Sequence, residues 1–342
     1  MISTALPARM NAVRIAAPGR APETVRLPVP TPAPGQYLVR VEACGVCHSD
    51  LHIRRGDENL PPEAYPLVLG HEGIGRIVAG EGPLPVGTRV GLPWVHETCL
   101  DCRPCRTGRE TYCPDQRVRG LDLPGAFAEY AVLSTRFAVP VPDGIDPVRG
   151  APLLCAGLTA WAALERCTVR AGARLLVVGA GGLGQHAVEI GRARGLRVAV
   201  VDTDPAKRSG ALALGASLAV DADGVEAVRA WGGADIVLNF APTPAVWDLI
   251  AGVVNPLSEV VAVALVHDPV PLSMMWLIDG GHRVMGSSVG TRADVQALLG
   301  FAAEFPSAVP VEAVPLGAVA EALDRLERGE VAGRLVVDLS LG

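Results

Sequence analysis

The sequence predicts an α/β protein with two domains, a β-rich first part and a doubly wound second part. The chain has 342 residues, more than most single cores contain. Its first part is rich in Pro and Gly with short Val-rich runs, whereas apolar strands alternate with helical stretches further on. We expect one domain over 1–150, a second over 151–288, and a C-terminal segment over 289–342 that returns to the first domain.

The sequence pattern of the first domain is that of short strands joined by tight turns. The runs QYLVRVEA (36–43), GIGRIVAG (73–80) and GTRVGLPW (87–94) combine Val and Ile with flanking Gly or Pro. Such segments are typical of short strands that end at turns. The first domain is therefore predicted to be mostly β-structure.

The second domain begins a different pattern. Residues 173–204 contain a continuous apolar strand, a glycine turn, a helix with Ala, Val and Ile at helical spacing, and a second strand, which together form one βαβ unit. ADIVLNF (234–240) and EVVAVAL (259–265) continue the alternation and predict a parallel sheet with helices on both faces. The tail over 318–340 predicts an amphipathic helix, a turn at Gly329 and a last strand.

Charge and hydropathy narrow the class of partner. A formal net charge of -6 argues against a nucleic-acid surface. No apolar run reaches the roughly 18 to 20 residues of a membrane span, and the N-terminus lacks the pattern of a secretion signal. We expect a cytoplasmic protein with no nucleic-acid or membrane partner. The eight cysteines are not spread like a disulfide framework, so reduced, metal-binding thiols are expected.

A glycine motif predicts a dinucleotide site. Its GxGxxG pattern lies between a strand and a helix, where the glycines permit a tight turn and the helix N-terminus favours a pyrophosphate. Asp202 ends the next strand, can accept both ribose hydroxyls and would repel a 2′-phosphate, so NAD is expected. Lys207 and Arg208, as cations near the ribose, leave NADP as the alternative. The loop residues expected at the cofactor are Gly179, Gly181, Gly182, Leu183 and Gly184.

A cysteine-rich lobe, placed at 94–116, predicts a structural metal site. Its segment CLDCRPCRTGRETYC carries four thiols at spacings x2, x2 and x7. Four thiolates from one loop make a closed tetrahedral zinc site without a position for substrate. An iron–sulfur cluster is the alternative, although the spacing lacks a ferredoxin-like Cys-Pro ending. The expected ligands are Cys99, Cys102, Cys105 and Cys113.

Scattered residues predict a second, open zinc site. A catalytic zinc needs three protein ligands, and Cys₂His is one known set. His71 and Cys155 supply two of them. The third is Cys44 or Cys47, and spacing alone does not choose between these two cysteines.

Seven ordered motifs resemble those of zinc-dependent medium-chain alcohol dehydrogenases of the bacterial and yeast type. They are GVCHSDLH, GHEGIGRIVAG, the four-cysteine lobe, LLCAGLT, GAGGLGQHAV, GSSVGTRADV and GRLVVDLS. The resemblance implies a chaperonin-10-like catalytic domain, a Rossmann domain, NAD, and two zinc ions per chain, one catalytic and one structural. It also implies that Cys47 is the third ligand of the catalytic zinc, with Cys44 as a small buried hydrophobe.

The resemblance assigns further roles in the segment after Cys47. It implies that His48 faces the cofactor pyrophosphate and that Ser49 hydrogen-bonds the substrate hydroxyl. It implies that Asp50 orients the metal site and that His52 passes protons to solvent. For His48 and Asp50, an exposed or ion-paired side chain is the alternative.

Three more roles come from the same resemblance. Glu72 would stand behind the catalytic zinc and tune its charge. Arg334 would face a cofactor phosphate, with a simple ion pair as the alternative, and Trp94 would form an aromatic wall of the substrate pocket, with core packing as the alternative. Four residues match no motif position and are assigned no functional role: Cys167, His186, His267 and His282.

The resemblance therefore implies an NAD-dependent alcohol dehydrogenase that acts on small primary alcohols, with secondary or aromatic alcohols next, and yields the aldehyde or ketone. A polyol-type dehydrogenase is disfavoured because that branch usually has a carboxylate where this chain has Cys155. A catalytically silent zinc- and nucleotide-binding sensor is the alternative from another class. We expect a homotetramer, with a dimer as the alternative. The apolar stretch VPLSMMWLIDG (270–280) is either a subunit interface or ordinary core.

Overall fold

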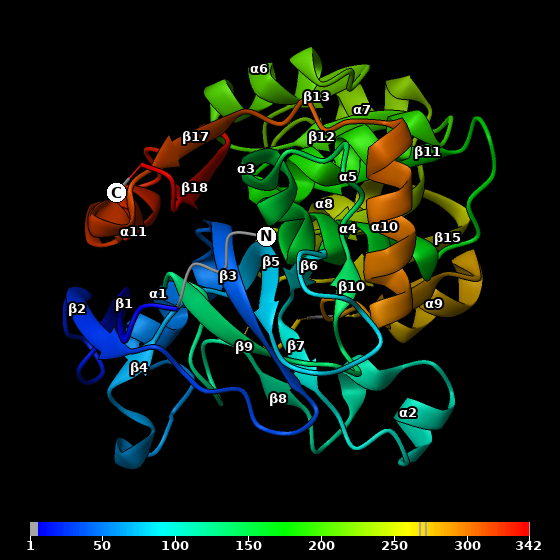
Figure 1. Ribbon diagram of the computed structural model, residues 1–342. Helices are drawn as coiled ribbons and strands as arrows, with labels where there is room; N and C mark the ends of the chain where they lie inside the picture. Colours follow the sequence, from blue (N-terminus) through cyan, green and yellow to red (C-terminus); the bar gives the residue numbers. More distant parts are fainter. Residues whose placement is uncertain (1–5, 267, 271, 342) are drawn as a thin grey trace. The chain divides into compact units, whose positions relative to one another are not determined.

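A computed structural model describes residues 6–266, 268–270 and 272–341, and Figure 1 shows the course of the chain. The chain divides into two compact units. Unit 1 comprises Met1–Cys155, Thr291–Glu304 and Val311–Gly342, and unit 2 comprises Ala156–Gly290 and Phe305–Pro310. The predicted combination of a β-rich part and a doubly wound part is confirmed.

The units depart from the expected division at two boundaries, where 151–155 belongs to unit 1 and 289–290 to unit 2, and at one short segment further on. The sequence assigned all of 289–342 to the first domain, but Phe305–Pro310 belongs to unit 2. The segment is held by hydrogen bonds to Glu189, a half-buried residue of helix α5 (Gly182–Ala193). The carboxylate of Glu189 accepts one from Ser307 Oγ at 2.7 Å and another from the Ala308 backbone N–H at 2.5 Å.

Unit 1 is built on sheets whose strands pair antiparallel, except for the parallel pair of β17 and β18. Within the described residues, its largest sheet has the strand order β10-β6-β5-β3-β18-β17, with β9 paired to β3, and a smaller sheet has the order β2-β1-β4. The strands are β1 (Arg9–Ile15), β2 (Glu23–Pro28), β3 (Gln36–Gly45), β4 (Leu67–Val68), β5 (Glu72–Ala79), β6 (Arg89–Leu92), β7 (Val95–Glu97), β8 (Arg117–Val118), β9 (Tyr130–Ser134), β10 (Val139–Pro140), β17 (Val311–Val314) and β18 (Arg334–Asp338).

The helices of unit 1 are short except at the C-terminal end. They are α1 (His48–Arg55), α2 (Arg103–Arg106), α3 (Pro147–Gly150), α10 (Arg292–Glu304) and α11 (Val319–Glu327), with 3₁₀ turns at η1 (Pro62–Ala64), η2 (Glu110–Tyr112), η3 (Ala151–Leu154) and η4 (Leu316–Ala318). The predicted tail is confirmed as helix α11, a turn in which Gly329 has a φ of 71°, and strand β18.

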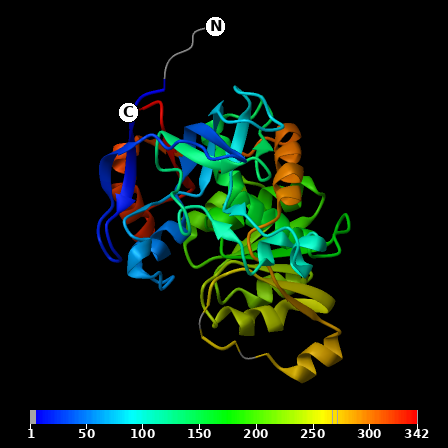
Figure 2. The same cartoon turned by 60° about the horizontal axis from the view of Figure 1, so that its bottom comes forward.

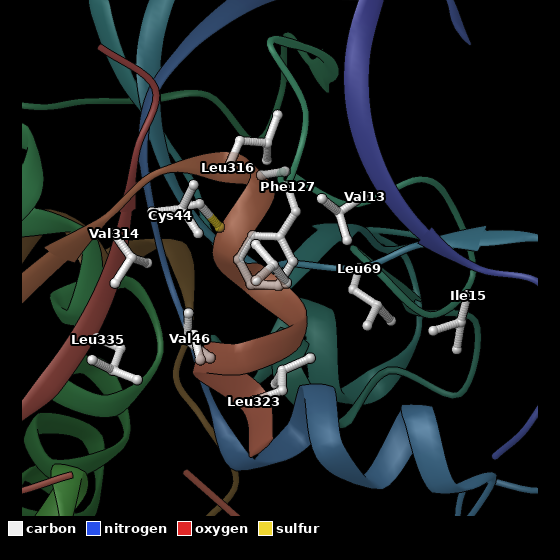
Figure 3. Close-up of a cluster of buried hydrophobic side chains, with 14 of the residues drawn as sticks. Val13, Ile15, Cys44, Val46, Leu69, Phe127, Val314, Leu316, Leu323 and Leu335 are labelled. Carbon is white, nitrogen blue, oxygen red and sulfur yellow. The ribbon is translucent and has the colours of Figure 1, made fainter. Parts of the chain in front are cut away.

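A hydrophobic cluster joins distant parts of unit 1. Figure 3 shows Phe127 at its centre, with Val13, Leu69 and Leu323 from three different segments around it. Cys44 belongs to this cluster and is completely buried, so its thiol occupies the core beside apolar side chains. Burial raises the pKa of Cys44 well above its usual value, which keeps it a neutral thiol.

Unit 2 is a doubly wound parallel sheet. In the part of the chain that is described, its strand order is β13-β12-β11-β14-β15-β16, and all neighbouring strands pair in parallel. The strands are β11 (Arg174–Val178), β12 (Arg197–Val201), β13 (Leu218–Val220), β14 (Ala234–Asn239), β15 (Val254–Ala262) and β16 (Arg283–Gly286). The core strands are almost wholly buried because helices cover a parallel sheet on both faces.

Two helices of unit 2, α6 and α9, begin at a side-chain cap. Helix α6 starts where the Asp204 side chain accepts the Ala206 N–H at 2.8 Å and Pro205 takes the first helical position. Figure 2 shows α9, drawn in gold, at the rim of this unit. The helices are α4 (Ala156–Glu165), α5 (Gly182–Ala193), α6 (Pro205–Ala213), α7 (Val225–Trp231), α8 (Val246–Val253) and α9 (Met274–Gly280).

Candidate active site

Four buried side chains of unit 1 converge on one point. They come from the start of α1, the start of β5 and the residue after η3, and their ligand atoms all lie within 4.8 Å of one another. The pairing of β3 with β5 places Gly45 opposite Glu72, which brings the two chain segments together. The group consists of Cys47, His71, Glu72 and Cys155. The structure therefore brings Cys47, and not Cys44, to His71 and Cys155.

Cys47 is held in a state suited to metal binding. Its backbone N–H donates to Asp50 Oδ2 at 3.0 Å, which fixes the first turn of α1. Hydrogen bonding from the Cys155 thiol, together with the His71 ring, holds the pKa of Cys47 well below its usual value against the opposing effect of burial. Conversely, Cys47 and burial raise the pKa of Cys155. A thiolate is thus favoured at Cys47, and thiolate is the metal-binding form of cysteine.

Asp50 orients the histidine of this group. Asp50 Oδ1 lies 3.2 Å from His71 Nδ1 and also accepts the Gly70 N–H at 3.1 Å. Burial lowers the pKa of His71, but the charge of Asp50 outweighs it and raises this pKa well above its usual value. With Nδ1 directed at Asp50, Nε2 is the nitrogen left for a ligand. Among the described residues, this buried Nε2 has no hydrogen-bond partner.

The chemistry of these donors fits zinc. Two cysteine sulfurs and one imidazole nitrogen make a Cys₂His set, which is found at catalytic zinc sites that keep a fourth position open. A buried histidine nitrogen without a protein partner costs free energy unless something binds it. A carboxylate behind the coordinating histidine, as Asp50 is here, is also the usual arrangement at zinc sites.

The carboxylate of Glu72 is bound by the guanidinium of Arg334. Arg334 Nη2 lies 2.7 Å from Glu72 Oε1 and 2.6 Å from Oε2, and it also donates to the Val46 carbonyl. Burial raises the pKa of Glu72 to about 7 and Arg334 opposes this, while Glu72 raises the pKa of Arg334. Both carboxylate oxygens of Glu72 are thus bound by Arg334, although Glu72 also belongs to the group of four candidate ligands. A role of Arg334 toward a cofactor phosphate stays a prediction.

The close approach of Glu72 depends on a residue that the sequence did not single out. A Cβ atom on Gly45 would lie 1.8 Å from Glu72 Oε2, so any larger residue would collide with the carboxylate. Gly45 has an ordinary extended conformation in β3, and its only sequence signal is its place at the start of the GVCHSDLH motif, two residues before Cys47. Glycine is thus required here by space alone.

Polar side chains of α1 follow the candidate ligand Cys47 along the helix. Ser49 Oγ lies 3.9 Å from Cys47 Sγ, so the hydroxyl stands at the metal ligands. His52 lies one turn further along α1 with a third of its side chain exposed, and its Nδ1 is 2.8 Å from Asp57 Oδ2. His48 is exposed at the start of the helix. The helix thus carries a series of polar groups from the buried ligands toward solvent.

Trp94 flanks the same group. Its ring packs edge-on against His71, with ring centroids 4.8 Å apart and planes at 88°. Trp94 is only partly buried, unlike the ligands. The indole therefore borders the candidate metal position, which suits both a wall of a pocket and a support for the His71 ring.

The four lobe cysteines form a second, more exposed group. The Cys99 sulfur lies 3.5 Å from that of Cys113 and 3.9 Å from that of Cys105, and Cys105 and Cys102 are 3.5 Å apart. These separations match the edges of a tetrahedron with ligands about 2.3 Å from its centre, the usual Zn–S distance. Backbone N–H groups of Asp101 and Cys102 lower the pKa of Cys99 to about 7. The lobe therefore fits one closed zinc ion.

The glycine loop has the backbone that its pattern predicts. Gly179 has a φ of 91°, a left-handed conformation that favours glycine. A Cβ on Gly184 would lie 2.0 Å from the Gly179 carbonyl oxygen, so helix α5 could not pack this closely with a larger residue. Gly181 precedes the first turn of α5, which contains Gly182, Leu183 and Gly184.

Asp202 stands beside this loop. Its Oδ2 accepts the Ala180 N–H at 2.7 Å and its Oδ1 accepts the Asp204 N–H at 2.9 Å, which places the carboxylate at the carboxyl end of β12. Arg208 Nη1 donates to the Asp202 carbonyl at 2.7 Å and pairs with Asp221 at 3.0 Å. The guanidinium is therefore already engaged, whereas Lys207 lies in the first turn of α6.

Three of the residues without an assigned functional role lie in unit 2, and the fourth lies outside the described residues. Cys167 is half-buried in unit 2, and burial raises its pKa to about 12. His186 lies inside α5, and His282 Nδ1 is 2.7 Å from Ser258 Oγ. His267 lies outside the described residues. Over the described residues, the structure contains no helix long and apolar enough to cross a bilayer.

Comparison with known proteins identifies the family. The model of the alcohol dehydrogenase GroES-like domain matches residues 33–143, and the model of the zinc-binding dehydrogenase matches residues 182–304. An alcohol dehydrogenase of Geobacillus stearothermophilus is 38% identical over 312 residues, which cover 89% of this chain and 92% of the relative.

Solved structures agree with this assignment. A cinnamyl alcohol dehydrogenase from Sorghum bicolor superposes with a TM-score of 0.88 at 30% identity, covering 97% of this chain and 98% of that one. An acetophenone reductase from Geotrichum candidum in complex with NAD superposes with a TM-score of 0.85 at 28% identity, covering 98% of both chains. On the similarity to the curated relative and the two family models, the chain belongs to the zinc-dependent medium-chain alcohol dehydrogenase family.

Proposed function

We propose that this protein is an NAD-dependent alcohol dehydrogenase that interconverts small primary alcohols and their aldehydes, with secondary and aromatic alcohols as further substrates. One observation carries the proposal. The buried Nε2 of His71 has no partner among the described residues and faces two cysteine sulfurs, with the hydroxyl of Ser49 close by. This combination suits a metal that binds the oxygen of an alcohol beside a proton-accepting group.

Two zinc ions per chain are part of the proposal. Cys47, His71 and Cys155 would hold the catalytic ion, and the four lobe cysteines would hold the structural one. Bound at the first set, zinc would act as a Lewis acid on the alcohol oxygen and ease loss of its proton. Glu72 and Asp50 would tune and orient the ligands without coordinating.

Two side chains of α1, Ser49 and His52, are the two ends of the proposed proton path, and the ribose of the bound cofactor would lie between them. Ser49 accepts the hydrogen bond of the substrate hydroxyl and donates its own proton outward as it receives the new one. His52 is the base at the exposed end of the path and releases the proton to solvent. Asp50 keeps His71 and the start of α1 in place throughout, since it bonds to both. When bound, NAD would supply the acceptor for the hydride of the alcohol.

The proposal of NAD as the cofactor rests on Asp202. Its carboxylate lies at the end of β12 beside the glycine loop, where a ribose bound by such a loop would present its hydroxyls. A 2′-phosphate would meet this negative charge. The nearest arginine, Arg208, is engaged by Asp221 and by backbone carbonyls, which supports NAD over NADP.

The proposed assembly is a homotetramer in which copies meet through α9. Its side chains are unusually exposed for apolar residues, with Met274 at 67%, Met275 at 60% and Ile278 at 66%. The adjacent β16 is the edge strand of the unit 2 sheet, and edge strands are normally covered or paired. A second copy of this chain would cover both features. Of the apolar stretch over 270–280, the described part over 272–280 is then an interface, and Pro271 lies outside the described residues.

Absorbance at 340 nm tests the proposed reaction. The protein, loaded with zinc, is given NAD and a panel of primary, secondary, polyol and aromatic alcohols, the last including cinnamyl alcohol because a relative is named for it. Small primary alcohols should give the highest kcat/KM. Ser49→Ala should reduce the rate by about 10²-fold or more, as loss of a general acid–base group does. NAD binding without turnover of any alcohol would instead favour the sensor alternative.

A further inference from the structure

We propose that Asp57 is a positioning residue that holds His52 in a single tautomer for proton transfer. Asp57 Oδ2 lies 2.8 Å from His52 Nδ1, a normal hydrogen-bond distance. The inference rests on the proposed function, because it concerns the base at the end of the proton path. No family motif named above contains Asp57.

The end of helix α1 brings the two side chains together. Gly56 has a φ of 88° and a left-handed conformation, and its N–H donates to the carbonyls of His52 and Ile53. The next residue, Asp57, donates its N–H to the same His52 carbonyl at 3.0 Å. This turn is a common helix ending that glycine favours. It folds Asp57 back over the last turn, so a residue five positions away meets His52.

The chemistry of the pair defines the tautomer. An ionised carboxylate can only accept hydrogen bonds, so His52 Nδ1 must carry the hydrogen that lies between them. In neutral imidazole the other nitrogen, Nε2, then has the lone pair and is the atom that takes a proton. After Nε2 returns this proton to water or buffer, the ring is ready for the next turnover.

Neighbouring charges leave this pairing undisturbed. Arg54 and Arg55 follow His52 on α1, and each pairs with an acid of α11, Asp324 at 2.6 Å and Glu327 at 2.5 Å, respectively. Both guanidiniums are therefore directed toward α11. The same two pairs attach α1 to α11 and keep the end of the helix, with its His52 and Asp57 pair, in a defined position.

A double-mutant cycle measures the proposed coupling. Asp57→Asn and Asp57→Ala should each lower the rate of alcohol oxidation about fivefold, because the wrong tautomer becomes populated and water replaces the base only in part. The same changes should have no effect in a His52→Gln background. Glu58→Gln, which removes the next, exposed acid along the chain, is the matched control and should keep the wild-type rate. Equal losses in both backgrounds, or no loss in the wild-type background, would overturn the proposal.

Nitrogen NMR tests the tautomer without catalysis. In protein labelled with [¹⁵N]histidine, the resonances that disappear in His52→Gln belong to His52, and in the wild type they should show a protonated Nδ1 and an unprotonated Nε2. Asp57→Ala should shift them toward a mixture, and Glu58→Gln should not. A mixture already present in the wild type would overturn the inference. Protein without alcohol dehydrogenase activity but with the expected signals would disprove the proposed function alone.

Discussion

Asp50 Oδ1 lies 3.2 Å from His71 Nδ1, and both side chains are completely buried. The same carboxylate group accepts backbone N–H groups from Cys47 and Gly70. One side chain thus fixes the backbone of one candidate ligand and the ring orientation of another. Asp50 therefore supports two of the candidate ligands without itself being one of them.

Replacing Asp50 should therefore weaken metal binding. Asp50→Asn keeps the shape but loses the charge that holds His71 Nδ1–H, and removal of such a partner typically costs about 10- to 100-fold in metal affinity. Competition with a chelator measures this, by the zinc retained per chain. Ser49→Ala is the control, since it should lose activity while it retains zinc. Unchanged retention in Asp50→Asn would contradict the role assigned to Asp50.

The two proposed zinc ions should have separable roles. The wild type should contain about two zinc ions per chain. Cys47→Ser should lose one zinc and all turnover but keep its fold, whereas Cys102→Ser should lose one zinc and thermal stability, because closed sites contribute folding free energy. Elemental analysis and thermal unfolding test this. Cys44→Ala, a buried thiol outside both groups, should retain both ions; iron in the lobe would contradict the proposal.

Asp202→Ala should change the choice of cofactor. It removes two ribose hydrogen bonds and one charge that repels a 2′-phosphate, so KM for NAD should rise and KM for NADP should fall. Because Asp202 also accepts the Ala180 N–H at 2.7 Å, Asp202→Asn separates the two effects, since its amide oxygen can keep that bond. Steady-state kinetics with both cofactors test this. Equal use of both cofactors by the wild type would refute the argument from Asp202.

The ion pair between Glu110 and Arg292 should make the free energy of unfolding depend on pH. Arg292 donates to Glu110 from Nε at 2.8 Å and Nη2 at 2.7 Å. Burial raises the pKa of Glu110, but these bonds outweigh it and lower the pKa below its usual value. A carboxyl group with a lowered pKa stabilises the fold fully above the unfolded-state pKa of about 4.3 and loses that contribution as pH falls through its folded-state pKa.

Glu110→Gln should consequently reduce the free energy of unfolding by about 2 kcal/mol at pH 7. The difference from wild type should shrink below about pH 4, where the carboxyl group becomes protonated. Urea unfolding at pH 7, 5 and 3 measures this difference in the free energy of unfolding. Glu330→Gln, which breaks an exposed pair with Arg328, should leave stability nearly unchanged at every pH. A difference that stays constant across this range would contradict the ionic origin of the effect.

The exposed face of α9 should decide assembly. Ile278→Glu places a charge on a surface where Ile278 is 66% exposed, so it should disfavour association without harming the fold of the subunit. Light scattering should show a smaller species than the wild type. Val86→Glu, at another exposed apolar residue (63%), is the matched control and should leave the mass unchanged. A wild-type protein that is monomeric at micromolar concentration would disprove the proposed interface.

Local sequence determined the elements that depend on nearby residues. The glycine turn before α5, the alternation of unit 2 and the tail from α11 to β18 follow from hydrophobic period, caps and glycine conformation, which act over a few residues. The close spacing of the lobe cysteines likewise predicted one group. The turn at Gly329 was also predicted from the sequence, and Gly329 has a φ of 71°.

Only the tertiary structure decided relationships between distant residues. Spacing could not choose between Cys44 and Cys47, because both lie near the end of β3; the fold packs Cys44 beside Phe127 and turns Cys47 toward His71. The Arg334–Glu72 pair joins residues that are 262 positions apart. The place of 305–310 in unit 2 likewise depends on hydrogen bonds to Glu189, which is 118 positions before Ser307. Such contacts form only when a sheet brings distant strands together, so no local pattern records them.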